Sequence, residues 1–370
     1  MSYIINIAKK HIMNFPGKRL DKKYVVFESD DWGSERITSN EGLKYLISSG
    51  IDVYSNPFNH LDTLETGDDL SALFETLKKF RDRQGNHPVI TANSVTANPH
   101  FEKIKASGFN EYYYENTLQT YNNKKGCEDS YALIKDGIAA NIYHPQFHGR
   151  EHLNVKQWLK ALRTGDETLL KAFSAGIYGV DQDLDLTKRG NFMAAFDSNS
   201  DQEALEYESI IKEGAALFKD IFGYSSGSFI APCYIWHPSL EIPLKENGIK
   251  CLQGLPIQYA PVHGKKYRKI YHYQGERNKI QQVYFIRNCF FEPAFNSHYN
   301  WIEDCRRRIK IVFSWGKPAI IGTHRINYIG SLNEENRKKN LRDFSVLLKM
   351  IVETWPDAEF ITTDKLGELY

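Results

Sequence analysis

The 370-residue chain lacks a strong charge of either sign, a cysteine framework and any long apolar run. Its 47 Lys and Arg residues balance 46 Asp and Glu residues, so no overall field would attract nucleic acid or an anionic membrane. The five cysteines are odd in number and contain no C-x-x-C pair, which argues against a disulfide framework or a zinc ribbon. No segment approaches the roughly 20 apolar residues of a membrane span. We therefore expect neither a nucleic-acid partner nor a membrane span.

The first residues, MSYIINIAKKHIMNFPGKR, have no apolar stretch long enough for a signal peptide, because lysines interrupt the short one present. Together with the scattered cysteines, this predicts a cytoplasmic location. Aromatic side chains, in contrast, are plentiful, with 22 Tyr, 21 Phe and 6 Trp. Such a surplus is typical of sugar-binding clefts and equally of an aromatic-rich core.

Apolar runs typical of strands alternate with helical patterns along the chain. In the helical patterns apolar residues recur at i, i+3, i+4 and i+7, as in Leu341, Phe344 and Leu348. This alternation predicts an α/β fold with parallel strands and helical returns. Seven such strands fit a distorted (β/α)7 barrel, with the active site at the C-terminal ends of the strands. The seven runs lie at 23–29, 88–94, 138–144, 226–232, 250–255, 317–323 and 358–363.

One stretch, 256–287, interrupts the alternation and is typical of a hairpin-like insertion near the cleft. No internal repeat, low-complexity tract or linker divides the rest of the chain. We therefore predict a single domain over residues 1–370, with an insertion near 256–300.

Polar residues suited to hydrolytic chemistry follow three of the predicted strands, whose C-terminal ends meet at one edge of a parallel sheet. In the first group, the adjacent carboxylates of Asp30 and Asp31 each raise the free-energy cost of ionising the other. A bound cation would offset this cost, and so would different roles for the two residues, one as a general base and the other as a metal ligand. The three groups are Asp30 and Asp31 in VVFESDDWGSER, His144, His148 and His152 in YHPQFHGREHLN, and His324 and Arg325 in IIGTHRINY.

The histidines offer two overlapping i, i+4 pairs, each able to place two imidazoles close enough to share a metal. His148 belongs to both pairs. Gly149 and a helix start near Asn154 favour a compact turn that carries His148 and His152. We prefer this pair, with His144 behind it as a supporting or substrate contact. The alternative is a solvated histidine-rich turn.

In this order the motifs resemble those of the polysaccharide deacetylase superfamily, the NodB-homology fold. ESDDWG stands for T-F-D-D-G, HGREH for H-[ST]-x-x-H, and IGTH (321–324) for L-x-H. FIAPCY (229–234) stands for the R-x-P-Y segment, but Ile230 or Ala231 occupies the place of the arginine that normally orients the catalytic aspartate. Arg287 or Arg325 would have to substitute for it.

The resemblance implies that Asp31, His148 and His152 hold a divalent ion. Zinc is the first choice, although cobalt, nickel or manganese would tolerate the same donors. It also implies that Asp30 is the general base and His324 the general acid, and that the substrate is an N- or O-acetylated sugar or saccharide. Aromatic residues next to the motifs are candidate substrate contacts, namely Trp32, Tyr234, Trp236 and Tyr328.

Two other functions are compatible with these residues. A carbohydrate-binding protein on the same fold, without turnover, would explain the missing arginine. A retaining glycosidase on a related seven-stranded barrel would use Glu28 or Glu151 as nucleophile, and requires two carboxyl groups about 5 Å apart. A glycosidase would not need the histidine cluster. The sequence indicates no particular oligomeric state.

Overall fold

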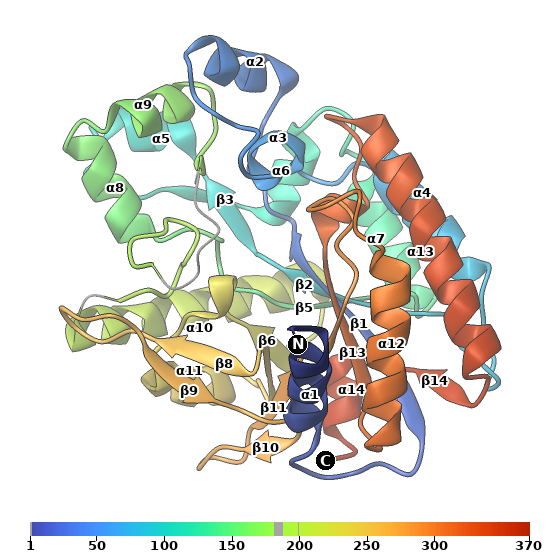
Figure 1. Cartoon of the computed structure of the whole chain (residues 1–370). Helices are drawn as coiled ribbons and strands as arrows, with labels where there is room; N and C mark the ends of the chain where they lie inside the picture. The colour runs from blue at the N-terminus through green and yellow to red at the C-terminus, as the bar shows by residue number, and fades with distance from the viewer. Residues whose placement is uncertain (1, 181–187, 199) are drawn as a thin grey trace.

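A mostly parallel sheet runs through the centre of the computed structural model, which describes residues 2–180, 188–198 and 200–370 (Figure 1). In the described residues the strand order is β10-β11-β7-β6-β5-β2-β1-β13-β12, and β14 pairs with β1. The β10–β11 ladder is antiparallel and the others are parallel, which confirms the predicted α/β class. The strands are β1 Lys23–Trp32, β2 Ile90–Ser94, β5 Tyr143–Phe147, β6 Ser228–Ile230, β7 Cys251–Gly254, β10 Glu276–Arg277, β11 Val283–Ile286, β12 Cys289–Phe290, β13 Ala319–His324 and β14 Ala358–Phe360.

The pairing path is open, so the predicted closure into a barrel is not confirmed. Nevertheless, β11 pairs with β7 while β12 pairs with β13, and only Arg287 and Asn288 separate β11 from β12. The backbone N–H of Arg287 donates to the carbonyl of Gly254 (2.9 Å), and that of Asn288 donates to Ile320 (3.2 Å). One extended segment, 283–290, therefore contacts both β7 and β13.

Two details of the predicted strand pattern are wrong. The run 138–144 begins in a helix, α7 (Ser130–Ala139), and the strand lies at Tyr143–Phe147 instead, after a turn in which Asn141 has a left-handed backbone (φ +53°). The small apolar residues of this run suit a helix end as well as a strand, so the pattern could not separate them. The second error is the prediction that the insertion-like stretch 256–287 interrupts the strand pattern. Its last strand, β11, and the strand β12 that follows it both belong to the main sheet.

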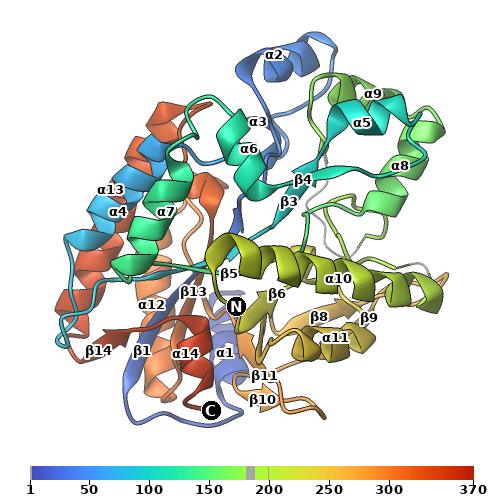
Figure 2. The same ribbon diagram turned by 180° about the vertical axis from the view of Figure 1, so that it is seen from behind.

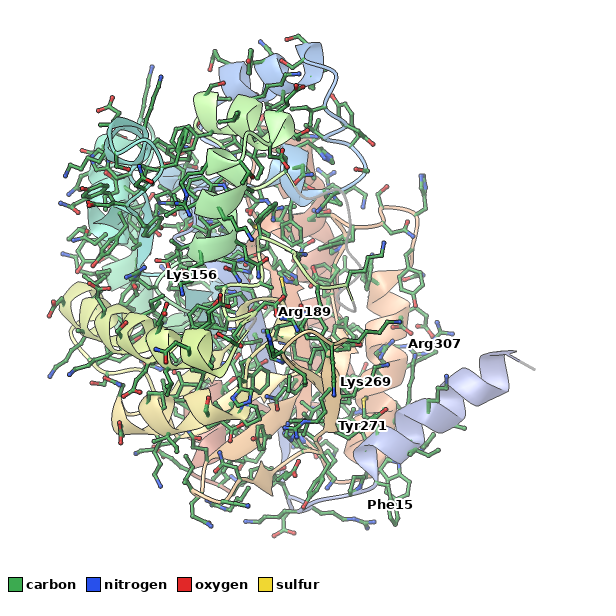
Figure 3. All side chains as sticks on the ribbon, turned by 90° about the vertical axis from the view of Figure 1, so that its left-hand side faces the viewer. Phe15, Lys156, Arg189, Lys269, Tyr271 and Arg307 are labelled. Atoms are coloured by element: carbon green, nitrogen blue, oxygen red, sulfur yellow. The ribbon has the colours of Figure 1, made fainter. Side chains whose placement is uncertain are left out.

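The first part of that insertion forms a hairpin, as predicted. β8 (Ile257–Ala260) pairs antiparallel with β9 (Arg268–Tyr271) in a separate two-stranded sheet. Lys269 and Tyr271 project outward from it (Figure 3), and Tyr271 is 69% exposed. Another two-stranded sheet joins β3 (Ala97–Pro99) to β4 (Tyr114–Asn116).

Helices cover both sides of the sheet (Figures 1 and 2). On one side lie α4 (Gly67–Lys78), α7, α12 (Trp301–Ser314) and α13 (Glu334–Thr354), and on the other α10 (Asp201–Phe222) and α11 (Glu241–Glu246). Toward the end to which β1 points lie α2 (Asn40–Ser48), α5 (Phe101–Ala106), α8 (Val155–Arg163) and α9 (Glu167–Ser174). The remaining helices are α1 (Ser2–Asn14), α3 (Phe58–Leu61), α6 (Thr117–Asn123) and α14 (Thr363–Gly367), with 3-10 turns at Pro232–Tyr234, Pro238–Leu240 and Arg325–Asn327. Over the described ranges, no helix combines the length and apolarity needed to cross a membrane.

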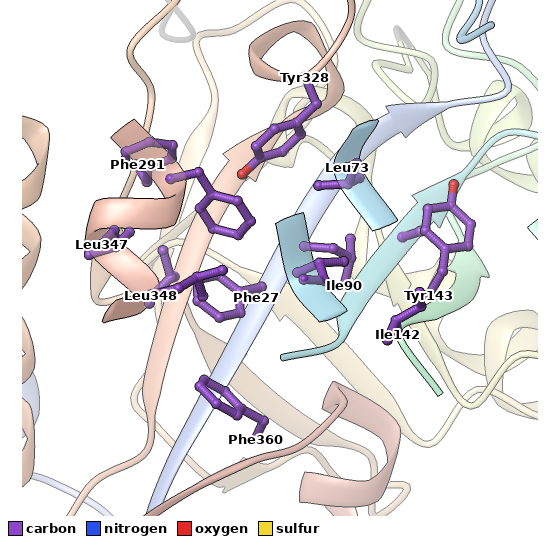
Figure 4. Packing of buried hydrophobic residues seen from close by; sticks show 14 of the residues in the cluster. Phe27, Leu73, Ile90, Ile142, Tyr143, Phe291, Tyr328, Leu347, Leu348 and Phe360 are labelled. Atoms are coloured by element: carbon purple, nitrogen blue, oxygen red, sulfur yellow. The ribbon is translucent and has the colours of Figure 1, made fainter. Parts of the chain in front are cut away.

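The main core lies between the sheet and the helices α4, α7, α12 and α13 (Figure 4). Phe27 on β1 packs edge-on against Phe344 on α13, with ring centroids 5.3 Å apart. Phe291 and Tyr328 also contact Phe344, at 5.6 and 5.2 Å. Because helices cover the parallel strands, β1 is apolar and buried from Val25 to Phe27, directly before its carboxylates begin.

Replacing Phe344 should destabilise the fold through this aromatic cluster. Phe344→Ala should lower the free energy of unfolding by about 3–5 kcal/mol, because it removes a fully buried ring and leaves a cavity. Val346→Ala, on the same helix but 53% exposed, should change it by about 0.5 kcal/mol or less. Urea unfolding followed by circular dichroism measures both, and equal losses would contradict this packing.

Candidate active site

The end of β1 is irregular, and the irregularity brings two consecutive carboxylates into one pocket. On a regular strand, neighbouring side chains point to opposite faces. Here the pairing with β2 shifts between Ser29 and Trp32, and Asp31 has a left-handed backbone (φ +74°). As a result Asp30 and Asp31 both line the pocket. A non-glycine residue in this conformation costs on the order of 1–3 kcal/mol, which the surrounding structure must offset.

Two histidines following β5 point their ring nitrogens at Asp31. Nε2 of His148 lies 3.4 Å and Nε2 of His152 3.3 Å from Asp31 Oδ1. His148 Nδ1 lies 2.9 Å from the carbonyl oxygen of Ile230, which can only accept, so Nδ1 carries the hydrogen and Nε2 keeps its lone pair. Both Asp31 Oδ1 and His148 Nε2 are buried, and neither has a hydrogen-bond partner in the part of the chain that the structure describes. A carboxylate oxygen and two imidazole nitrogens gathered in this way fit a divalent cation.

The charge states of Asp31 and His152 also suit a metal. Burial disfavours the Asp31 carboxylate, but His152 and His148 outweigh it and hold the Asp31 pKa below its usual range. Burial lowers the pKa of His152 to about 4, so this imidazole is neutral near pH 7. An anionic carboxylate and neutral imidazoles are the forms that bind metal ions.

Arg287, in the segment between β11 and β12, holds Asp30 with two hydrogen bonds. Its Nη2 donates to Asp30 Oδ1 (2.6 Å) and its Nη1 to Asp30 Oδ2 (2.7 Å), while Nε donates to Glu28 (2.8 Å). Burial would raise the pKa of Asp30, but the guanidinium outweighs it and lowers that pKa to about 2. Asn93 supports the same carboxylate through Nδ2 at 2.7 Å. Of the two arginines that the sequence offered as partners for the Asp30 carboxylate, Arg287 therefore makes the contact.

The other candidate, Arg325, does not contact Asp30. Its guanidinium is fully buried and donates to Asp62 (2.6 Å) and Glu65 (2.8 Å), and to the backbone carbonyl of Ser34 (2.8 Å). Arg325 thus connects the end of β13 to the loops around α3 and does not reach the pocket.

His324 ends β13 directly beside Asp30, its partner in the β1–β13 register. Its Nε2 lies 3.7 Å from Asp30 Oδ2, and its Nδ1 lies 2.7 Å from Glu292 Oε1. Burial lowers the pKa of His324, but the carboxylate of Glu292 outweighs it and raises that pKa to about 9. Asn327 donates to the second oxygen of Glu292 at 2.8 Å, which fixes the pair. Glu292 was not predicted, although an acidic residue directly after the apolar run CFF was a usable signal.

Five of these side chains line one cavity of about 220 Å³, namely Asp30, Asp31, His148, His152 and His324. Phe58 and Phe295 stand beside His324, with ring centroids 5.4 and 5.8 Å from the imidazole. Tyr234 also lines the cavity, and its hydroxyl accepts a hydrogen bond from Arg287 Nη1 (3.1 Å). Several lining residues come from loops, or from the start of the short helix α3, that carry no recognisable motif, among them Arg36, Asn56, Phe58, Asn191, Met193 and Phe295.

Three of the four predicted aromatic contacts lie in the core instead. Trp32 packs edge-on against Tyr143 (5.2 Å), and Tyr328 packs against Phe344. Trp236 is 4% exposed within another apolar cluster. None of the three lines the pocket, because in each case neighbouring apolar groups cover the ring.

His144 is likewise placed away from the metal trio. Its Nε2 contacts Asp364 on α14 (3.0 Å), and its ring stacks on Tyr224 with centroids 5.4 Å apart. His144 lies near the start of β5 and His148 directly after its end, so about 13 Å of extended chain separates the two residues. Of the two pairs that the spacing allowed, the structure brings together His148 and His152.

The carboxylates proposed for a glycosidase are engaged elsewhere. Glu28 accepts hydrogen bonds from Arg287 and Thr363 and is fully buried. Glu151 forms a paired contact with Arg150, at 2.6 and 3.0 Å. Neither residue lines the pocket, so the nucleophiles named for the glycosidase alternative are not placed there.

No protein-family model and no curated protein sequence matches the chain. Among solved structures, it is similar to a putative polysaccharide deacetylase from Mycobacterium smegmatis (12% identity over 96% of this chain and 92% of that chain, TM-score 0.44). A probable polysaccharide deacetylase from Pseudomonas aeruginosa PAO1 is also similar (7%, 93% and 89%, TM-score 0.48). A third is the 4-alpha-glucanotransferase from Thermococcus litoralis (9%, TM-score 0.44), of which the chain spans 41% while 95% of this chain is covered. These similarities concern the fold alone.

The trio should bind about one divalent ion per chain, because it forms an open set of ligands. His148→Ala should abolish this binding, since the substitution removes a nitrogen whose lone pair is already oriented by Ile230. His144→Ala, the matched control outside the pocket, should keep the ion. Elemental analysis after dialysis against zinc measures the stoichiometry. Wild-type zinc content in His148→Ala would rule out this ligand set.

Proposed function

We propose that the protein is a metal-dependent hydrolase that removes an N- or O-linked acetyl group from a sugar or saccharide. The observation that carries the proposal is the convergence of Asp31, His148 and His152 on one point beside Asp30 and His324. One carboxylate with two imidazoles is typical of catalytic zinc sites, and cobalt, nickel or manganese would suit the same donors.

When bound, the ion would supply a Lewis acid that polarises the scissile carbonyl and makes water more acidic. Asp30 is the candidate general base, because it lines the pocket and its low pKa keeps it anionic. It would take one proton from the attacking water. Arg287 fixes its position with two hydrogen bonds, which also keeps its basicity low.

His324 is the candidate general acid. Its contact with Glu292 holds the proton on the imidazole at neutral pH, and its Nε2 faces the pocket side occupied by Asp30. As the bond from the acyl carbon to the sugar nitrogen or oxygen breaks, His324 would give its proton to the leaving atom. Asp30 would thus accept the proton that the water loses, and His324 would supply the proton that the leaving atom gains.

The pocket suits a small, partly apolar group. Its volume of about 220 Å³ lies below the range of roughly 300–1,000 Å³ typical of drug-sized ligands. Phe58 and Phe295 offer apolar surface next to polar groups, as expected for one sugar unit. In the cytoplasm, the location that the sequence predicts, such sugars would be free, nucleotide-linked or lipid-linked.

The alternative is a carbohydrate-binding protein without turnover, which was suggested by the missing arginine. The contact of Arg287 with Asp30 removes that reason. Release of acetate from acetylated mono- and oligosaccharides by the zinc-loaded protein is the direct test. Sugar binding with a filled metal site but no acetate release would favour the alternative.

The two neighbouring aspartates should differ when each is changed to asparagine. Asp31→Asn should lose metal and activity together, because a ligand is removed. Asp30→Asn should keep the metal but lose turnover by roughly 100-fold or more, because the base is removed. Zinc content and acetate release are measured on the same preparations. Equal zinc content in both variants would show that the ligand is misassigned.

His324→Ala should affect two substrates differently. An amine leaving group needs a proton, so hydrolysis of an N-acetyl sugar should fall by roughly 10²–10⁴. An activated aryl acetate leaves as a stable anion, so its hydrolysis should be largely unchanged. Initial rates with both substrates, on folded and metal-loaded protein, give the comparison. Equal losses would indicate a structural role, and unchanged rates would exclude His324 from the reaction.

A further inference from the structure

Arg36, on the loop that follows β1, is a buried cation in the wall of the same pocket. It is 6% exposed, and its guanidinium lies over the ring of Phe58 at 5.1 Å. Nη2 donates to Asn59 (3.1 Å), and Nε has no hydrogen-bond partner within the described ranges. Arginine carries five N–H donors in a planar fork, so most of its capacity to bind an anion is unused here.

No carboxylate neutralises this guanidinium within ion-pair distance among the residues that the structure describes. Asp62 interacts with it electrostatically, but the hydrogen bond that Asp62 accepts comes from Arg325 Nη2 (2.6 Å). Buried charges are normally paired, since removing an ion from water is costly. Among the described residues, the wall of the pocket therefore holds a buried guanidinium without a direct ion pair, although Asp62 acts on it from a greater distance.

The chain makes room for Arg36 at this place. A Cβ added to Gly179 would lie 3.3 Å from Arg36 Nε and 2.7 Å from the methyl carbon of Met193, both of which belong to pocket-lining residues. Any side chain at position 179 would thus press on the two residues. The glycine keeps the guanidinium beside the cavity.

We propose that Arg36 binds an anionic substituent of the sugar, a carboxylate or a phosphate, so that the substrate is an acidic or phosphorylated acetyl sugar. The planar fork of arginine matches both groups through paired hydrogen bonds. The Phe58 ring would contact the sugar, while the Arg36 guanidinium that lies over this ring would bind the anionic substituent. This inference rests on the proposed function for the identity of the sugar, but not for the binding of the anion.

Binding of sugars without an acetyl group tests the proposal independently of turnover. Glucose, glucuronate and glucose 6-phosphate are titrated into the full-length zinc-loaded protein by calorimetry. Wild type should bind at least one of the two anionic sugars roughly tenfold or more tightly than glucose, as expected for hydrogen bonds to a charged group. Preference for glucuronate or for glucose 6-phosphate distinguishes a carboxylate from a phosphate. Equal affinity for all three, or no binding, would overturn the proposal.

Variants then locate the preference. Arg36→Gln should abolish the preference for an anionic sugar over glucose, and Arg36→Lys, which keeps the charge but not the fork, should retain part of it. Arg307→Gln is the control, since Arg307 is exposed on α12 (Figure 3) and pairs only loosely with Glu303 (3.7 Å). An unchanged preference in Arg36→Gln would overturn the proposal. Should that variant fail to fold, the wild-type comparison and Arg36→Lys decide.

The two proposals fail in different ways. If no acetylated sugar releases acetate but the anion preference is present and depends on Arg36, only the hydrolase is wrong. If acetate is released from neutral and acidic N-acetyl sugars at equal rates, with no change in Arg36→Gln, only the role of Arg36 is wrong.

Discussion

The paired hydrogen bonds between Arg287 and Asp30 are the contact on which the candidate site depends. Arg287 lies where one extended segment passes from pairing with β7 to pairing with β13, so its side chain reaches β1 across the interior. It also binds Glu28, and all three side chains are at least 96% buried. Without the guanidinium, two anions would remain in an apolar interior, which typically costs 3–5 kcal/mol. The position of the candidate base and the pairing of the sheet are thus stabilised together.

Much of the site could be predicted because its polar residues follow apolar strands. Asp30, Asp31 and His324 come at the ends of β1 and β13, and the parallel arrangement brings these ends to one edge. The turn after β5 was readable from Gly149, which has a left-handed backbone (φ +103°) between His148 and His152. The sequence did not indicate that Asp31 would be left-handed, and only that distortion lets adjacent carboxylates share a pocket.

The remaining features could not be predicted because they depend on contacts between distant parts of the chain. Proximity to a motif suggested that Trp32 would contact substrate, yet Tyr143 covers its ring. Arg36 lines the pocket from a loop and Phe58 from the first residue of the short helix α3, and neither segment carries a recognisable motif. The segment around Arg287 was assigned to an insertion because its strands are short, and only their pairing partners reveal that they belong to the main sheet.

The connectivity of this site has a consequence during synthesis on the ribosome. Asp30 and Arg287 are 257 residues apart, and β13, which pairs with one edge of β1, lies still further along the chain. A nascent chain released as far as β7 already contains Glu28 and Asp30, but neither the Arg287 guanidinium that pairs with them nor the strand β13 that pairs with β1. Because chains emerge from the N-terminus first, β1 must wait as an exposed, β-prone segment. The charges that end it, Glu28, Asp30 and Asp31, would then oppose intermolecular pairing until the partner strands emerge.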